Sequence, residues 1–234
     1  MATKAWLEGH QFDLEDLAQL LATGDVRVIR DADYLTAPDI DNPPDGTTYY
    51  EVAQSLLVHI NGLGRVSTAD FRPVQLTGSY STPTEQNVVI TPAPFESRAR
   101  MGAVGVVMGP DGQPKADPPS PWPNRLALAA THPDVAEVLD MMGSPAPLGF
   151  VELYNVHEVI RDSIKPKKIY ELGWATKADD SAFTGSANRA DVSGNEARHA
   201  RNPGQPPTHT MSLAEGRSYI GDLVTKWLDS LANP

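Results

Sequence analysis

A proline-rich segment near the middle of the chain places the strongest constraint on the fold. Residues 109–123 read GPDGQPKADPPSPWP and contain six prolines and two glycines. Proline lacks a backbone N–H and has a fixed φ angle, so a run this rich in proline favours an extended conformation over the interior of a helix or a central strand. We therefore predict two domains, at residues 1–108 and 124–234, joined by an extended, semi-rigid linker at 109–123.

The composition is that of a soluble globular protein. Of the 234 residues, 40% are hydrophobic and 21% are charged, which suffices for a buried core. The chain has no cysteine, which excludes disulfides, thiol chemistry and cysteine zinc sites. No stretch approaches the ~20 apolar residues of a membrane span, and the N-terminus lacks the apolar core of a signal peptide. We expect a cytoplasmic protein with no membrane partner.

The net charge of −11 limits the class of partner. An acidic surface repels phosphate backbones, so we do not expect the whole protein to bind DNA non-specifically. Local basic patches in the second half of the chain stay candidates for binding an anion or RNA.

Two helices are predicted in the first half of the chain. DLEDLAQLL is amphipathic, with Asp13 as its expected cap and Gly24 as its expected end. TTYYEVAQSLLVHINGLG has apolar residues at helical spacing, and we expect Gly62 or Gly64 to end that helix.

The same half contains the pattern of a small antiparallel sheet. DVRVIRDADYLTA alternates as a hairpin, and three further short strands are predicted in FRPVQLTGSY, QNVVITPA and RARMGAVGVVM. The connections between these strands are short, which favours antiparallel pairing.

The sequence of the second half of the chain predicts a helical bundle. THPDVAEVLDMMG has Pro133 at a first helical position and Gly143 after its end. GFVELYNVHEVIRDSI carries an apolar stripe, residues 168–182 have a weaker helical pattern, and Ser212 with Glu215 forms a capping box before the last helix. The predicted fold class is therefore α+β: an N-terminal domain with a small antiparallel sheet and two helices, then a C-terminal α-helical bundle.

The helix expected at residues 150–164 has a second, mixed face. Phe150, Tyr154, His157 and Arg161 are spaced by four, three and four residues, so they project to the same side. Three interpretations are open. The face makes a buried hydrogen-bonded or ionic contact with a neighbouring helix, it is a plain solvated face, or Tyr154, His157 and Arg161 line a cleft.

The segment NEARHARNPGQPPTHTMSL, at residues 195–213, is the main candidate for chemistry. It places Arg198, His199 and Arg201 before a proline loop, and His209 before the last helix. Histidine transfers protons near neutral pH, and arginine binds phosphate and stabilises developing negative charge. Three interpretations are open: the cluster binds and cleaves a phosphodiester, it only holds an anion, or its arginines pair with the surplus carboxylates of the chain.

No motif predicts a metal or a cofactor. His157 and Glu158 begin an HExxH pattern, but its last position is Arg161. His199 and His209 are ten residues apart across a proline loop, which is no recognised ligand spacing. We therefore predict neither a metal site nor a cofactor.

Three stretches of the second half resemble a known group of proteins: ELYNVHEVIRDSI, FTGSANRADVSGNEARHA and MSLAEGRSYIGDLVTKWL. Over residues 125–232 the chain is similar to bacterial, often actinobacterial, proteins whose helical half distantly resembles HEPN domains, including the C-terminal domains of abortive-infection proteins. The resemblance implies a compact bundle that often dimerises. In active members it also implies metal-independent RNA cleavage in phage defence or toxin–antitoxin systems, by an arginine and a histidine a few residues apart. Here Arg198 and His199 are adjacent.

The leading hypothesis is a cytoplasmic bacterial protein whose HEPN-like domain binds or cleaves RNA. As a ribonuclease, it would use His199 as general acid or base and Arg198 to stabilise the charge of the transition state. The residues expected to bind around this pair are Arg201, Arg161, His157, Tyr154, Glu158 and His209.

The alternative hypothesis is a non-enzymatic assembly or adaptor protein, and the sequence leaves open whether the chain is an enzyme. In the alternative, the same arginines and histidines make structural ion pairs, or ion pairs across an interface with a protein partner or in a homodimer formed by the helical domain. A third hypothesis is that the N-terminal half binds a small ligand between its sheet and its helices.

Overall fold

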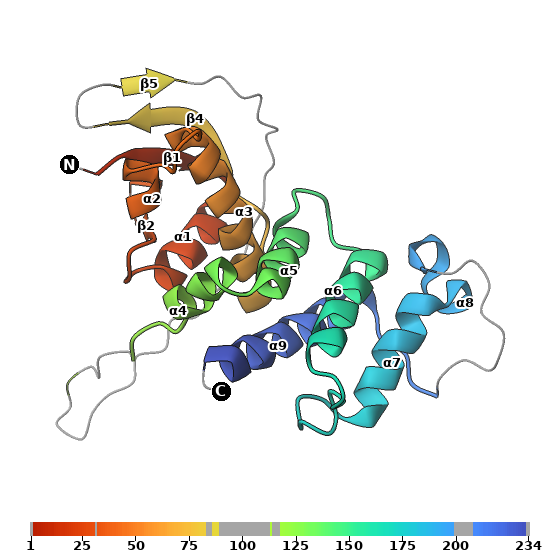
Figure 1. Cartoon of the computed structure of the whole chain (residues 1–234). Coiled ribbons are helices and arrows are strands. Elements are labelled where there is room, and N and C mark those ends of the chain that lie inside the picture. The colour runs from red at the N-terminus through yellow and green to blue at the C-terminus, as the bar shows by residue number, and fades with distance from the viewer. Residues whose placement is uncertain are drawn as a thin grey trace. The chain divides into compact units, whose positions relative to one another are not determined.

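The computed structural model describes residues 2–30, 32–82, 86–88, 113, 118–198 and 208–232. The chain divides into two compact units, and Figure 1 labels most of their helices and strands. Unit 1 comprises Met1–Ala53 and Val74–Pro123, and unit 2 comprises Gln54–Pro73 and Asn124–Pro234. Residues 109–112 and 114–117 of the expected linker lie outside the described residues, so the division of the chain at that segment stays a prediction.

Unit 1 is built on an antiparallel sheet, as the sequence predicts. The strands are β1 (Lys4–Glu8), β2 (Arg27–Ile29), β3 (Tyr34–Thr36), β4 (Gln75–Ser81) and β5 (Gln86–Val88). They pair in the order β2-β3-β1-β4-β5, and each neighbouring pair is antiparallel. The hairpin expected within residues 25–37 is confirmed as β2 and β3. The strand expected in RARMGAVGVVM lies outside the described residues.

The central strand β1 is one that the sequence patterns do not predict. Ala5 and Leu7 are buried, whereas Lys4, Trp6 and Glu8 are only half-buried. This alternation covers only five residues, which is too short to predict a strand from the sequence. The strand is instead stabilised by pairing with β3 and β4, which come from distant parts of the sequence.

Helices follow the first and third strands of unit 1: α1 (Gln11–Leu20), the short α2 (Pro38–Asp41) and the start of α3 (Tyr49–Ser67). The expected cap of α1 is wrong. The helix begins two residues earlier than Asp13, and His10 is its N-cap, because the ring Nδ1 accepts a hydrogen bond from the N–H of Phe12 at 3.3 Å. The order β1-α1-β2-β3-α3-β4 is the split βαβ topology.

The expected end of α3 is also wrong, because the helix continues through Gly62 and Gly64 to Ser67. A Cβ atom on Gly62 would lie 2.5 Å from the carbonyl oxygen of Leu139, and one on Gly64 would lie 2.6 Å from the ring of Phe71. These glycines therefore permit close packing within unit 2 and do not end the helix.

The described chain beyond residue 121 is largely helical, as the sequence predicts. Its elements are α4 (Trp122–Ala127), a 3₁₀ turn (Leu128–Ala130), α5 (Pro133–Gly143), α6 (Phe150–Ser163), α7 (Lys177–Asn188), α8 (Ala190–Ser193), a 3₁₀ turn (Gly194–Glu196) and α9 (Leu213–Ala232). The start of α5 at Pro133 and the capping box of Ser212 and Glu215 before α9 are both confirmed.

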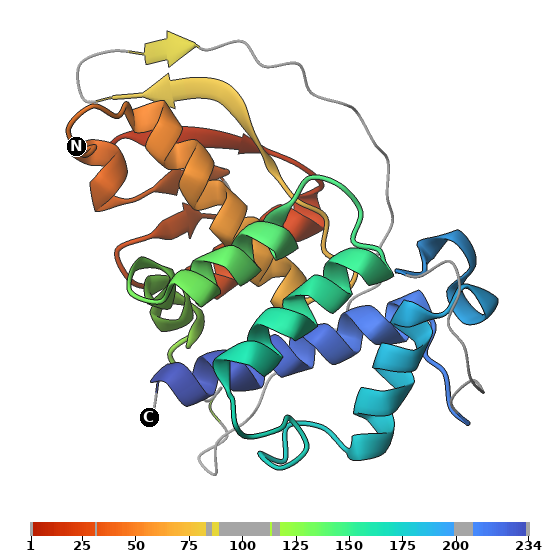
Figure 2. The same cartoon turned by 45° about the vertical axis from the view of Figure 1, so that its right-hand side comes forward.

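Helix α6 lies at the centre of unit 2. It packs against α5, α7 and α9, which Figure 2 shows around it. Its side chains Leu153 and Ile160 are fully buried, together with Phe183 of α7 and Trp227 of α9. In the described part of the chain, no helix has the length and apolar character needed to cross a membrane.

Candidate functional site

The mixed face of α6 is buried at one end and exposed at the other. Helix α6 begins at Phe150, where Glu152 accepts a hydrogen bond from the N–H of Gly149 at 2.9 Å. Phe150, Tyr154 and His157 are buried. Arg161, at the last turn, keeps 48% of its side chain exposed. The predicted face therefore contains both an interior and a surface cluster.

The interior cluster consists of His157, Asp180 and Tyr219, from three different helices. His157 is 1% exposed, and its Nε2 lies 2.8 Å from Oδ1 of Asp180. The Tyr219 hydroxyl donates to the same oxygen at 3.0 Å. Asp180 is placed by the first turn of α7, which Thr176 caps through its side chain. One carboxylate oxygen thus joins α6, α7 and α9.

The charges of this cluster follow from the environment of Asp180. Burial acts to raise the pKa of the Asp180 carboxyl. The hydrogen bond and charge interaction with His157, the Tyr219 hydroxyl and the charge of Arg161 outweigh burial, so the pKa lies below its ordinary value. Burial and the Asp180 charge raise the pKa of Tyr219. Asp180 is therefore ionised and can only accept hydrogen bonds, so Nε2 of His157 carries the proton.

Aromatic rings enclose the His157 imidazole. The ring of Phe183 lies 5.4 Å from it and stacks on Tyr219 at 5.1 Å, and the ring of Tyr154 lies 5.9 Å away. Nδ1 of His157 is buried and has no hydrogen-bond partner among the described residues. With one nitrogen bound to Asp180 and the other enclosed, His157 is placed to hold helices together and not to exchange protons with a substrate.

The surface cluster consists of Arg198, Glu158, Tyr154 and Arg161. Nη2 of Arg198 lies 3.2 Å from Oε2 of Glu158, and its Cζ lies 4.6 Å from the centre of the Tyr154 ring. Nη2 of Arg161 reaches the other oxygen of Glu158 at 3.5 Å. The backbone N–H of Arg198 donates to the carbonyl of Ala187 at 2.8 Å. Arg198 is therefore anchored through both its backbone and its guanidinium.

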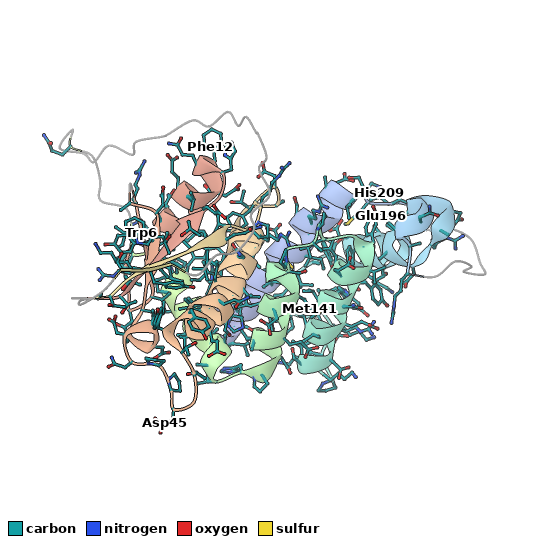
Figure 3. The ribbon with its side chains drawn as sticks, turned by 90° about the horizontal axis from the view of Figure 1, so that it is seen from above. Trp6, Phe12, Asp45, Met141, Glu196 and His209 are labelled. Carbon is teal, nitrogen blue, oxygen red and sulfur yellow. The ribbon has the colours of Figure 1, made fainter. Side chains whose placement is uncertain are left out.

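The structure thus brings together Tyr154, His157, Glu158, Arg161 and Arg198 of the predicted site. His199 and Arg201 lie outside the described residues. His209 is exposed just before α9 (Figure 3). There Ser212 lowers the pKa of Glu215 through its hydrogen bonds, and the charge of His209 acts in the same direction.

The sequence does not reveal Asp180 and Tyr219. The only signal at Asp180 is its place after Thr176, where acidic residues commonly stabilise the first turn of a helix. Nothing in the sequence pairs either residue with His157, because that contact depends on how three helices pack. No group of three or more metal-ligating side chains occurs in the part of the chain that the structure describes.

No protein-family model, curated protein or solved structure matches this chain. The resemblance of residues 125–232 to HEPN domains therefore stays a prediction.

Proposed function

We propose that the chain is a non-enzymatic assembly or adaptor protein, and that the arginines and histidine around α6 stabilise its helical unit. One observation carries the proposal: the guanidinium of Arg198 is held at its edge by Glu158 and on its face by Tyr154. Carboxylates and phosphates bind a guanidinium through the same planar donors. The arginine of the expected catalytic pair is thus already engaged in a contact within the chain.

The interior cluster supports the same proposal. His157 is almost fully buried, and its hydrogen bond to Asp180 joins two helices that Tyr219 links to a third. The two hydrogen bonds that Asp180 accepts, from His157 and from Tyr219, favour the packing arrangement in which α6, α7 and α9 meet. A rigid helical unit of this kind is suited to presenting a surface to a protein partner or to a second copy of the chain.

A second candidate function is metal-independent RNA cleavage of the HEPN type, in a bacterial defence setting. One observation favours it: Arg198 and Arg161 both contact the single carboxylate of Glu158 at the surface. A phosphate that displaced this carboxylate would meet two guanidiniums at once. His199, the residue after Arg198, would then supply the acid or base.

An RNA-cleavage assay without metal separates the two functions. The wild-type chain, Arg198→Ala and His199→Ala are incubated with labelled single-stranded RNA in EDTA between pH 6 and 8. The adaptor function predicts that none of the three proteins cleaves RNA above the rate in buffer. Cleavage by the wild type that is lost in both variants would contradict the adaptor function and support the ribonuclease.

A matched control removes a cation outside the cluster. Lys165 forms an exposed ion pair with Asp162 three residues away, so Lys165→Ala changes the net charge of the protein by the same amount as Arg198→Ala. Cleavage that persists in Lys165→Ala and disappears in Arg198→Ala assigns the activity to the cluster. Equal loss in both variants would show that the activity depends on net charge and not on the cluster, and it would contradict both proposed functions.

A further inference from the structure

The sheet of unit 1 has an outer face that differs from the rest of this acidic chain. Ala5, Leu7, Val28, Leu35 and Tyr80 are buried on the inner face. Side chains alternate along a strand, so their neighbours project from the opposite face. We call this the outer sheet face, and its members include Lys4, Trp6, Glu8, Arg27, Tyr34, Gln75 and Ser81.

Two aromatic side chains form the centre of the outer sheet face. Trp6 of β1 and Tyr34 of β3 are directly opposite each other in the ladder, and their ring centres are 5.5 Å apart at an interplanar angle of 64°. Figure 3 labels Trp6 among the side chains of the sheet. Its Nε1 donates to the Ser81 hydroxyl at 3.1 Å, which fixes the orientation of the indole. Both rings are only half-buried, so each retains accessible surface.

Basic side chains lie beside this aromatic pair. Nζ of Lys4 lies 4.9 Å from the centre of the Tyr34 ring, and Arg27 of the neighbouring strand β2 is exposed. Glu8 is the one acidic member of the set named above, at the other end of β1. A chain with a net charge of −11 therefore places two cations and two aromatic rings on one face of its sheet.

We propose that the outer sheet face binds single-stranded RNA, with bases stacked on Trp6 and Tyr34 and phosphates bound by Lys4 and Arg27. Unpaired bases expose flat π faces, and aromatic side chains on neighbouring strands of an antiparallel sheet bind them in many RNA-binding modules. The Lys4 ammonium now lies over Tyr34, and its flexible stem allows it to move to a phosphate when a base takes that position.

The polar side chains on β4 favour RNA over DNA. The Ser81 hydroxyl accepts from Trp6 and also carries a proton that it can donate, and the exposed Gln75 amide lies opposite Glu8 on the same face. Hydroxyl and amide groups recognise the ribose 2′-hydroxyl, which DNA lacks. The proposal does not rest on the proposed function, because its residues all belong to unit 1 and the Arg198 cluster belongs to unit 2.

Fluorescence anisotropy of a labelled, mixed-sequence RNA 12-mer with the full chain tests the proposal. Loss of one stacked base is expected to weaken binding roughly 5- to 100-fold in Trp6→Leu and in Tyr34→Leu. Trp6→Phe keeps a stacking ring and should bind within a few-fold of the wild type. The control is Tyr50→Leu, because Tyr50 is an exposed tyrosine on α3 and not on the sheet. Its affinity should be unchanged.

Three results would overturn the proposal. The first is no binding at about 100 μM protein, the weak end of non-specific binding to nucleic acid. The second is binding that Trp6→Leu and Tyr34→Leu leave unchanged while both variants remain folded. The third is binding of duplex RNA or single-stranded DNA of the same sequence as tightly as the RNA 12-mer. If Trp6→Leu unfolds the chain, the affinities of Trp6→Phe and Tyr34→Leu for the RNA test the proposal in its place.

Discussion

His157 and Asp180 are 23 residues apart in the sequence and meet with 2.8 Å between Nε2 and Oδ1 inside unit 2. The same carboxylate oxygen accepts the hydroxyl of Tyr219 from α9. Because one residue is almost fully buried and the other is ionised, each depends on the contact. Removing a donor should therefore destabilise the helical unit.

Tyr219→Phe removes one donor and keeps the ring that stacks on Phe183. We expect the free energy of unfolding to fall by about 1.5 kcal/mol, the usual contribution of a hydrogen bond to a charged group. Urea unfolding followed by circular dichroism measures it. Tyr50→Phe is the control, since an exposed tyrosine should change stability by less than about 0.5 kcal/mol. Equal stability of Tyr219→Phe and the wild type would contradict the role given to Asp180.

The lowered pKa of Asp180 predicts how stability depends on pH. The folded state binds the carboxyl proton of Asp180 less tightly than the unfolded state does. The stabilisation that ionised Asp180 provides is therefore complete at pH values above the ordinary carboxyl pKa. It is lost as the pH falls through the pKa that Asp180 has in the folded state. Between pH 6 and pH 3 the wild type should lose more unfolding free energy than Asp180→Asn. If the free energy of unfolding falls in parallel with pH for the two proteins, Asp180 is not the source of this pH dependence.

From the sequence, the residues of the site could be placed relative to one another only where they belong to a single helix. The spacing of Tyr154, His157 and Arg161 places them on one side of α6, and a regular helix guarantees that relation. Asp180 and Tyr219 come from α7 and α9, and helical periodicity carries no information on which turns of different helices meet. Arg198 reaches α6 because its backbone bonds to Ala187, a loop contact without a sequence signature.

Gly143→Ala should be strongly destabilising, and Gly216→Ala should not be. A Cβ atom on Gly143 would lie 1.9 Å from the carbonyl oxygen of Val58, so the backbones of α3 and α5 would have to separate. We expect a loss of about 3 kcal/mol in unfolding free energy. At Gly216 the nearest atom belongs to the Phe150 ring at 3.1 Å, which can shift, and alanine improves helix propensity by up to about 1 kcal/mol. Thermal unfolding of the two variants measures the difference, and equal melting temperatures would contradict the close approach.

The fold was predictable where local signals suffice. Pro133 and the Ser212–Glu215 box act within one helical turn, and α5 and α9 begin where they indicate. Gly62 and Gly64 were misleading because a glycine that ends a helix and a glycine that admits a neighbour look the same in sequence. Strand β1 depends on partners on both sides, so its five residues carry little signal of their own.

Arg65→Lys should destabilise the junction of α5 and α6. Nη1 of Arg65 donates to the carbonyls of Met142 and Ser144 at 2.9 and 2.7 Å, and Nη2 donates to Ala146 at 3.0 Å. Burial and the charge of Arg217 lower its pKa to about 10. A lysine ammonium lacks the planar fork that satisfies all three carbonyls, so we expect a loss of about 2 kcal/mol. Arg27→Lys, at an exposed arginine, is the control in the same urea titration, and an equal loss in both variants would contradict this role.

The most direct test of a structural role for Arg198 is a double-mutant cycle with Glu158. Urea unfolding of Arg198→Ala, Glu158→Ala and the double variant gives the coupling free energy of the pair. A structural contact predicts that Arg198→Ala lowers stability by about 1 kcal/mol, with a positive coupling of about 0.5 kcal/mol that weakens in high salt. An unchanged or increased stability of Arg198→Ala, with no coupling to Glu158, is the behaviour of a functional residue and would contradict the adaptor proposal.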